Sequence, residues 1–137
     1  MSPKKPRNPE PTVVGRLVAA AQHALAAIDP DAPAEALPHL RTAQERLVTA
    51  IDEAMAAVVL ADGATLRSAG LLAGLSENAV GPRLARTTLL AAYDTGSGRV
   101  TASGVERARY DVEEGRHRGS EAAATAPPMR FRARRTS

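Results

Sequence analysis

The stretch LRSAGLLAGLSENAVGPRLARTTLL, residues 66–90, sets the expected fold of the second half of the chain. It opens with an apolar run in which the small residue Gly70 would let another helix approach closely. Gly74 ends this run, and Leu75 follows as an expected buried anchor. Ser76 is a good N-cap for a second helix, because its hydroxyl can accept a hydrogen bond from a free backbone N–H. We therefore predict two short helices joined by a glycine turn.

Pro82 complicates the second helix, because an internal proline removes a hydrogen bond and costs about 3 kcal/mol. Two arrangements are open. In one, a single helix contains Pro82 and turns Val80 and Leu84 inward. In the other, residues 76–80 form a short turn and the helix begins at Pro82 and ends at Leu90. Both arrangements keep four polar side chains near one exposed surface: Ser76, Asn78, Arg83 and Arg86.

The segments on either side of this pair carry turn and capping residues. Asp62-Gly63 is typical of a turn, and Thr65 is expected to cap the first helix. Residues 94–98 are rich in turn formers, and residues 99–101 have strand character. Thr101 or Ser103 then caps a final helix that we expect to end at Glu114.

This order of elements resembles the winged helix-turn-helix of bacterial transcriptional regulators. The small and apolar positions of that pattern are matched by Ala69, Gly70, Ala73, Gly74, Leu75 and Val80. Members of the multiple-antibiotic-resistance regulator class have a Gly-rich hairpin tip, a strand, a Leu-Thr pair and a Gly-containing helix start. Val100-Thr101 and Gly104 match the last part of that pattern. The resemblance covers about residues 65–110 and implies a mainly α fold with a short β wing.

The chain departs from the family pattern at three places. Gly81-Pro82 lies within the second helix, and Arg83 stands where an apolar residue is usual. Glu77 opens the second helix with a negative charge, which suits the helix dipole but repels phosphate. These departures concern the segment that would contact DNA.

The resemblance implies a DNA-binding transcriptional regulator whose partner is double-stranded DNA. The second helix would lie in a major groove, where Ser76 and Asn78 contact base edges and Asn78 suits adenine. Four arginines would contact phosphates, the last of them from the wing: Arg67, Arg83, Arg86 and Arg99.

The first half of the chain is expected to form two helices. The first follows a stripe of Val14, Leu17, Val18, Ala21, Leu25 and Ile28 and stops at Asp29-Pro30. Residues 29–38 form a proline-punctuated connection, and a long helix follows to about Leu60. Its seam alternates steps of three and four: Leu37, Leu40, Gln44, Leu47, Ile51, Ala54 and Val58. Val48, Met55 and Val59 widen this face, whereas the charged residues outside it should be solvated: Arg41, Glu45, Arg46, Asp52 and Glu53.

Two packing arrangements are open for the long helix. It packs on the first helix as an antiparallel hairpin, or its wide stripe also buries against a second subunit, giving a homodimer through residues 12–60. We accordingly divide the chain into a basic arm, an acidic helical hairpin, a winged-helix-like head and an Arg-rich tail. These segments cover residues 1–11, 12–62, 63–114 and 115–137.

The composition excludes several classes of function. The 137 residues include no cysteine, and His23, His39 and His117 have no metal-ligand spacing, so we expect no metal and no cofactor. No serine stands in a nucleophile motif and no phosphate-binding loop occurs, so we expect no enzyme. No apolar run reaches the about 20 residues of a membrane helix, and the N-terminus lacks a signal-peptide pattern. A cytoplasmic protein is the resulting expectation.

Charge is distributed unevenly along the chain, whose net charge is +3. Residues 1–10 carry +2 and residues 115–137 carry +5, whereas residues 11–64 carry −4. We expect both termini to be disordered, and either to contact phosphates without sequence preference or to be simply solvated. Residues 65–114 are neutral, which is unusual for a DNA-binding domain. The alternative function is therefore a small all-helical protein–protein interaction module that uses the helix over residues 38–60.

Overall fold

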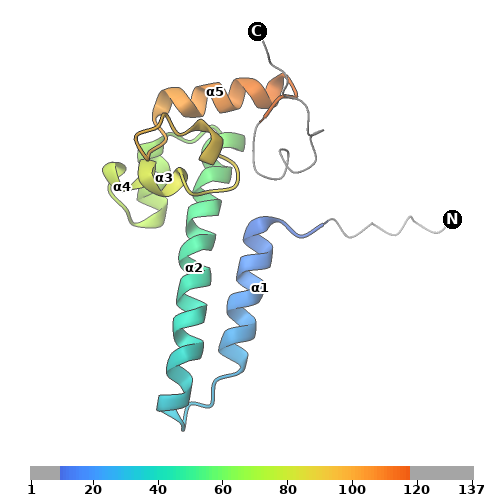
Figure 1. The fold of residues 1–137 in the computed structure, drawn as a ribbon, viewed down its shortest axis with the longest axis vertical. Helices are drawn as coiled ribbons and strands as arrows, with labels where there is room; N and C mark the ends of the chain where they lie inside the picture. The colour runs from blue at the N-terminus through green and yellow to red at the C-terminus, as the bar shows by residue number, and fades with distance from the viewer. Residues whose placement is uncertain (1–9, 118–137) are drawn as a thin grey trace, which may run out of the picture. The chain divides into compact units, whose positions relative to one another are not determined.

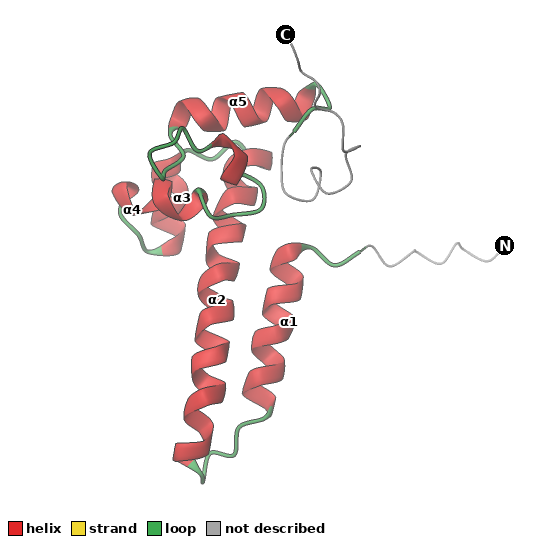
Figure 2. Ribbon diagram, in the orientation of Figure 1, coloured by secondary structure: helices red, strands yellow, loops and turns green. Residues whose placement is uncertain are grey.

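The computed structural model describes residues 10–117, which form helices and connecting loops without any strand (Figure 1, Figure 2). The predicted mainly α fold class is therefore confirmed. Residues 99–101, expected as a strand of the wing, are in a loop. The predicted basic arm and tail lie outside the described residues, apart from residues 10–11 and 115–117. Within the described part of the chain, no helix has both the length and the apolar character to cross a membrane.

The chain divides into two compact units, and the boundary between them lies within one long helix. We call residues 10–51 the hairpin unit and residues 52–117 the head unit. The long helix α2 (Pro33–Ala61) contributes its first part to the hairpin unit and its last ten residues to the head unit. The structural division therefore falls within α2, and not after it, because the end of α2 supplies side chains to the core of the head unit.

The hairpin unit pairs α1 (Val13–Ala26) with the first part of α2, and the two helices run antiparallel (Figure 1). Thr12 caps α1 by accepting a hydrogen bond from the Gly15 backbone N–H at 2.9 Å. The helix α2 begins at Pro33, earlier than expected, because proline at the first helical position sacrifices no hydrogen bond. Pro38 lies inside the helix and does not end it.

The interface within the hairpin unit is made of small side chains. Ala21 and Ala24 of α1 cluster with Ala43 of α2, and Ala36 and Ala50 are buried one heptad to either side. The larger residues of the predicted stripes remain exposed: Val18, Leu25, Leu37, Leu40, Leu47, Val48 and Ile51. The hairpin prediction therefore has the right topology but the wrong face. Alanines allow the helices to approach closely, and the leucine seam points elsewhere.

The head unit surrounds the end of α2 with α3 (Leu66–Ala73), α4 (Glu77–Leu84), a 3₁₀ turn η1 (Ala91–Tyr93) and α5 (Ala102–Glu113). Its core contains eleven buried residues: Met55, Ala56, Val59, Ala69, Val80, Leu84, Leu90, Tyr93, Val100, Val105 and Ala108. Thr101 caps α5 through the Gly104 backbone N–H, so the first of the two predicted caps is confirmed.

Arg109 joins α5 to the C-terminal end of α2. Its guanidinium donates to the Val59 carbonyl oxygen at 2.9 and 2.8 Å and to the Ala64 carbonyl oxygen at 2.9 Å. Carbonyl groups at a helix C-terminus have no partner within the helix, so a side-chain donor is stabilising there. The sequence gives no indication of this role.

Candidate nucleic-acid interface

The turn between α3 and α4 depends on two glycines. Gly74 takes the left-handed conformation, with φ of 75°, and ends α3. A Cβ atom at Gly70 would lie 2.8 Å from Val80 Cγ2 and 2.9 Å from the Leu75 carbonyl oxygen. The close approach predicted at Gly70 is therefore present, and it is made by the start of α4 and the turn itself.

The N-terminal ends of the two helices are capped differently. Thr65 and Ser68 form a capping box, in which each side chain accepts a hydrogen bond from the other residue's backbone N–H at 3.0 Å. Ser76 occupies the N-cap position of α4 but makes no side-chain capping bond, contrary to expectation. Its exposed hydroxyl is therefore not used by the helix that it precedes.

The helix α4 is continuous through Pro82 and ends at Leu84, so the first of the two predicted arrangements is correct. The alternative helix from Pro82 to Leu90 is not formed. Since Pro82 has no N–H, the Asn78 carbonyl lacks its usual partner four residues later. Arg99 Nη2 lies 3.5 Å from that oxygen.

The loop before α5 is held against α4 by a second contact. The Val100 backbone N–H donates to the Gly81 carbonyl oxygen at 3.0 Å. A Cβ atom at Gly81 would lie 2.9 Å from the Val100 carbonyl oxygen, so only glycine fits without displacement. The Gly81-Pro82 pair, which departs from the family pattern, is thus the place where the Arg99 loop docks on α4.

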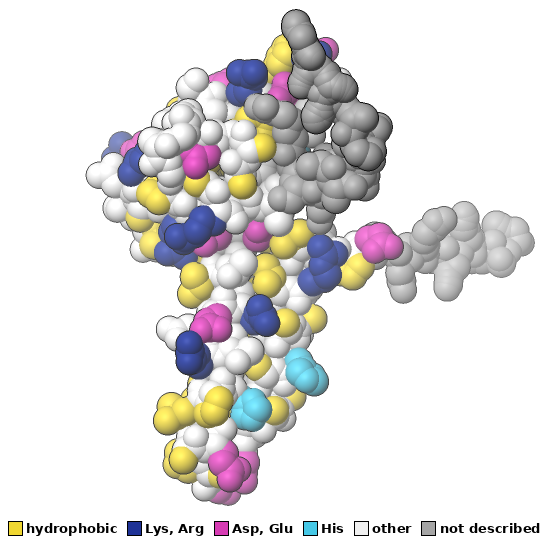
Figure 3. All heavy atoms as spheres, in the orientation of Figure 1, with side chains coloured by type: hydrophobic (Ala, Val, Ile, Leu, Met, Phe, Trp, Pro, Cys, Tyr) yellow, Lys and Arg dark blue, Asp and Glu magenta, His cyan; other side chains and the backbone are white. Residues whose placement is uncertain are grey.

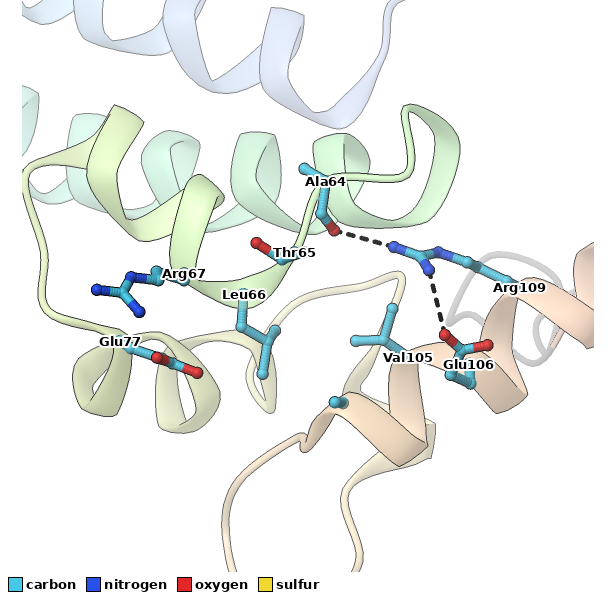
Figure 4. A pocket seen from close by; sticks show the side chains of 9 residues that line it. Ala64, Thr65, Leu66, Arg67, Glu77, Val105, Glu106 and Arg109 are labelled. Atoms are coloured by element: carbon cyan, nitrogen blue, oxygen red, sulfur yellow. Dashed lines mark hydrogen bonds and ion pairs between the residues drawn. The ribbon is translucent and has the colours of Figure 1, made fainter.

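Four of the six predicted contact residues gather around the start of α4. Ser76 and Asn78 are exposed, and Arg99 reaches the Asn78 carbonyl from the loop. Arg67 is exposed on the first turn of α3 and lines, together with Glu77, an open pocket of about 330 Å³. Figure 4 shows Arg67 and Glu77 at one end of this pocket.

The far end of the same pocket is occupied by a second charged pair. Arg109 Nη1 lies there 3.5 Å from Glu106 Oε2. Leu66 and Val105 lie between the two ends of the pocket (Figure 4). Arg109 already donates hydrogen bonds to the Val59 carbonyl of α2 and to the Ala64 carbonyl of the following loop. The only arginine of this pocket that is exposed and near the start of α4 is therefore Arg67.

The remaining two predicted residues lie at the other end of α4 and share one carboxylate. Arg83 Nε is 2.6 Å from Asp52 Oδ1, and Arg86 Nη2 is 3.7 Å from Asp52 Oδ2. The Arg83 side chain is 24% exposed and the Arg86 side chain is 67% exposed. Arg83 is thus bound to α2 within the head unit, whereas Arg86 presents most of its surface to solvent.

Asp52 and Glu53 were expected to be solvated, and this expectation is wrong: they are 6% and 4% exposed. Glu53 accepts hydrogen bonds from the Thr88 backbone N–H at 3.0 Å and from the Thr88 hydroxyl at 2.9 Å. A buried carboxylate needs polar partners: Asp52 has the guanidinium groups of Arg83 and Arg86, and Glu53 has the hydrogen bonds from Thr88. Helical periodicity could not identify them, because it assumes that the polar side of α2 faces water along its whole length.

The surface near the start of α4 carries charges of both signs. Arg67 and Arg99 provide positive charge there, and Glu77 provides an exposed negative charge in the first turn of α4. Within residues 10–117, no group of three or more His, Asp or Glu side chains could hold a metal ion. The arrangement offers hydrogen-bonding side chains next to arginines, on a helix whose other side is buried.

Comparison of the chain with protein-family models, with curated proteins and with solved structures gives no match in any of the three.

Proposed function

We propose that this protein binds double-stranded DNA through α3, the Gly74 turn and α4, with the start of α4 directed at the duplex. The observation that carries this proposal is the fit of Gly70 against Val80 and Leu75. It fixes α4 across α3 and buries Val80 and Leu84, while Ser76 and Asn78 stay exposed. A helix-turn-helix reads DNA with the N-terminal residues of its second helix, which are the residues exposed in this chain.

The exposed residues have distinct roles in this proposal. Asn78 contacts a base edge, for which its amide suits adenine, and the free hydroxyl of Ser76 contacts a base or a phosphate. Arg67 and Arg99 contact phosphates beside the start of α4, and Arg86 does so beyond its end. Arg83, bound to Asp52, has a positioning role, because it fixes the end of α4 on α2.

The neutrality of residues 65–114 also holds for their exposed side chains, which are four arginines and four glutamates: Arg67, Arg86, Arg99, Arg107, Glu77, Glu106, Glu113 and Glu114. Among the other acids there, Asp111 is buried and accepts a hydrogen bond from the Tyr93 hydroxyl at 2.8 Å. Asp94 accepts bonds from the Gly96 and Gly98 N–H groups at 2.9 and 3.0 Å. Glu77, in the first turn of α4, is the exposed acid that lies among the proposed contact residues and acts against phosphate there.

The test is the binding of the full chain to labelled duplex DNA at several salt concentrations, measured by fluorescence anisotropy. The double variant Arg67→Ala/Arg99→Ala should weaken binding about tenfold or more and reduce the salt slope by about 2. The matched control Arg46→Ala/Arg107→Ala removes two exposed arginines elsewhere and should change affinity much less. Equal losses in both double variants would leave only nonspecific attraction and would contradict the proposed surface.

A second function, that of a helical interaction module built on α2, is favoured by one observation. Leucine side chains of α2 remain exposed although the helix packs on α1. Variants on this surface and variants at the start of α4 lie in different units, so their effects on DNA binding and on association can be measured separately.

A further inference from the structure

The outer side of α2 carries an apolar seam that nothing in the hairpin unit covers. Apolar side chains recur at steps of three and four, at Leu37, Leu40, Leu47 and Ile51, and Gln44 completes the repeat. These four apolar residues are 65%, 46%, 42% and 40% exposed. Figure 3 shows hydrophobic side chains reaching the surface along the hairpin unit. We call these five residues the seam.

The contact with α1 uses the neighbouring edge of the helix. In heptad notation Leu37, Gln44 and Ile51 are a positions, and Leu40 and Leu47 are d positions. The buried alanines at 36, 43 and 50 each precede an a position and are therefore g positions. Because α1 packs along the g edge, the a and d positions stay free for another helix.

We propose that a second copy of this chain covers the seam, with the two α2 helices side by side and parallel about a two-fold axis. A heptad seam is self-complementary, since the knobs of one helix fit the holes of an identical helix. The four apolar seam residues offer roughly 350 Å² per copy toward the about 800 Å² that each partner of a stable complex buries, and the neighbouring Val48, 40% exposed, adds to this area. The largest apolar patch on a typical monomer has about this size and is often functional.

The polar residue in the seam indicates the parallel orientation. In a parallel pair each a position faces its own counterpart, so Gln44 meets Gln44 of the second copy and the two amides can hydrogen-bond. In an antiparallel pair a positions face d positions, and Gln44 would be buried against leucine without a partner. The seam carries no charge, and Arg41 beside it is paired with Glu45 at 3.1 Å.

This association does not depend on DNA binding, because every seam residue lies in the hairpin unit and every proposed DNA contact lies in the head unit. Failure of one proposal leaves the other intact.

The first test is the mass of the full chain in solution, measured by sedimentation. The wild type should have twice the 14.3 kDa of one chain. The double variant Leu40→Glu/Leu47→Glu should raise the dissociation constant about 100-fold or more and give a monomer with unchanged helicity. The matched control Leu71→Glu/Leu72→Glu alters two leucines of α3 that are even more exposed, 73% and 79%, and should remain a dimer. A monomeric wild type, or a dimeric seam variant, would overturn the proposal.

The second test does not require the seam to be disrupted. The chain has no cysteine, so a single introduced cysteine reports its own distance to the second copy. Under mild oxidation Leu37→Cys should form a covalent dimer, because equal a positions are adjacent only in the parallel arrangement. Thr42→Cys, exposed on the opposite side of α2, should not. Equal crosslinking at both positions, or none at position 37, would contradict the parallel seam.

Discussion

The two units of the chain differ in which apolar side chains they bury. The head unit builds its core from large side chains such as Leu84, Leu90 and Val59, although Leu71 and Leu72 stay exposed. It also provides hydrogen-bond partners for the buried acids Asp52 and Glu53. The hairpin unit buries alanines and leaves its leucines exposed. Both units are rich in Ala and Leu, so composition does not decide which residue is inside. The position of each residue relative to the neighbouring helix decides it.

This difference has an energetic consequence. A buried leucine contributes about 1.5–3 kcal/mol through removal from water, and an alanine contributes much less. The head unit therefore completes its core from its own residues. The hairpin unit leaves most of its larger apolar side chains exposed, and if a second copy covers them as proposed, its stability should depend on protein concentration.

The largest expected contrast comes from the same substitution in each unit. Leu84→Ala removes a fully buried side chain from the head unit and should lower the free energy of unfolding by about 2–5 kcal/mol. Leu47→Ala alters a side chain that is 42% exposed and should cost less than about 1 kcal/mol in dilute solution. Urea denaturation followed by circular dichroism measures both. Equal losses of unfolding free energy in the two variants at low protein concentration would contradict this difference between the units.

A second contrast concerns acids on the same helix. Asp52→Asn leaves the largely buried Arg83 guanidinium without its anion and should cost about 1–3 kcal/mol. Glu45→Gln breaks the exposed pair with Arg41 and should change stability by less than about 0.5 kcal/mol. Thermal unfolding of the two variants measures this difference. A negligible effect of Asp52→Asn would show that the ion pair does not hold α4 on α2.

Substitution of Gln44, the polar residue of the seam, should strengthen an interaction, whereas the substitutions above weaken one. Gln44→Leu replaces a polar a position with an apolar one and should strengthen self-association, by about 1–2 kcal/mol, while weakening the preference for two chains. Sedimentation at several concentrations measures both properties. Weaker association of this variant would contradict a seam buried between copies.

The smallest expected effect is a change in DNA affinity when one exposed glutamate is neutralised in either unit. Glu77→Gln removes a negative charge beside the proposed phosphate contacts and should raise DNA affinity by about twofold to fivefold. Glu45→Gln, which removes an equal charge from the hairpin unit, should have less effect on affinity. Anisotropy titrations at one salt concentration compare the two directly. No gain for Glu77→Gln would place Glu77 away from the duplex.

Much of the helical order could be predicted from the sequence, because it is determined by local chemistry. Thr65, Gly74 and Thr101 mark helix ends through capping and left-handed backbone, and the structure places helix ends at each. The packing faces could not be predicted in the same way. Hydrophobic periodicity assigns the inside to the largest apolar stripe, whereas α1 packs on the alanines beside that stripe.

The candidate site could be predicted only in part, for the same physical reason. The exposure of Ser76 and Asn78 follows from their place at the start of a helix whose later residues are buried. The engagement of Arg83 by Asp52 depends on a contact between residues 31 positions apart. No local pattern records such a contact.

The most direct test of the proposed function is selection of binding sites by the full chain from a library of random duplexes. The wild type should enrich a defined motif that contains adenine, and Asn78→Ala should lose the preference at that base with a penalty of about 1–3 kcal/mol. Enrichment of no motif by the wild type, or an identical motif for Asn78→Ala, would contradict sequence recognition by the start of α4.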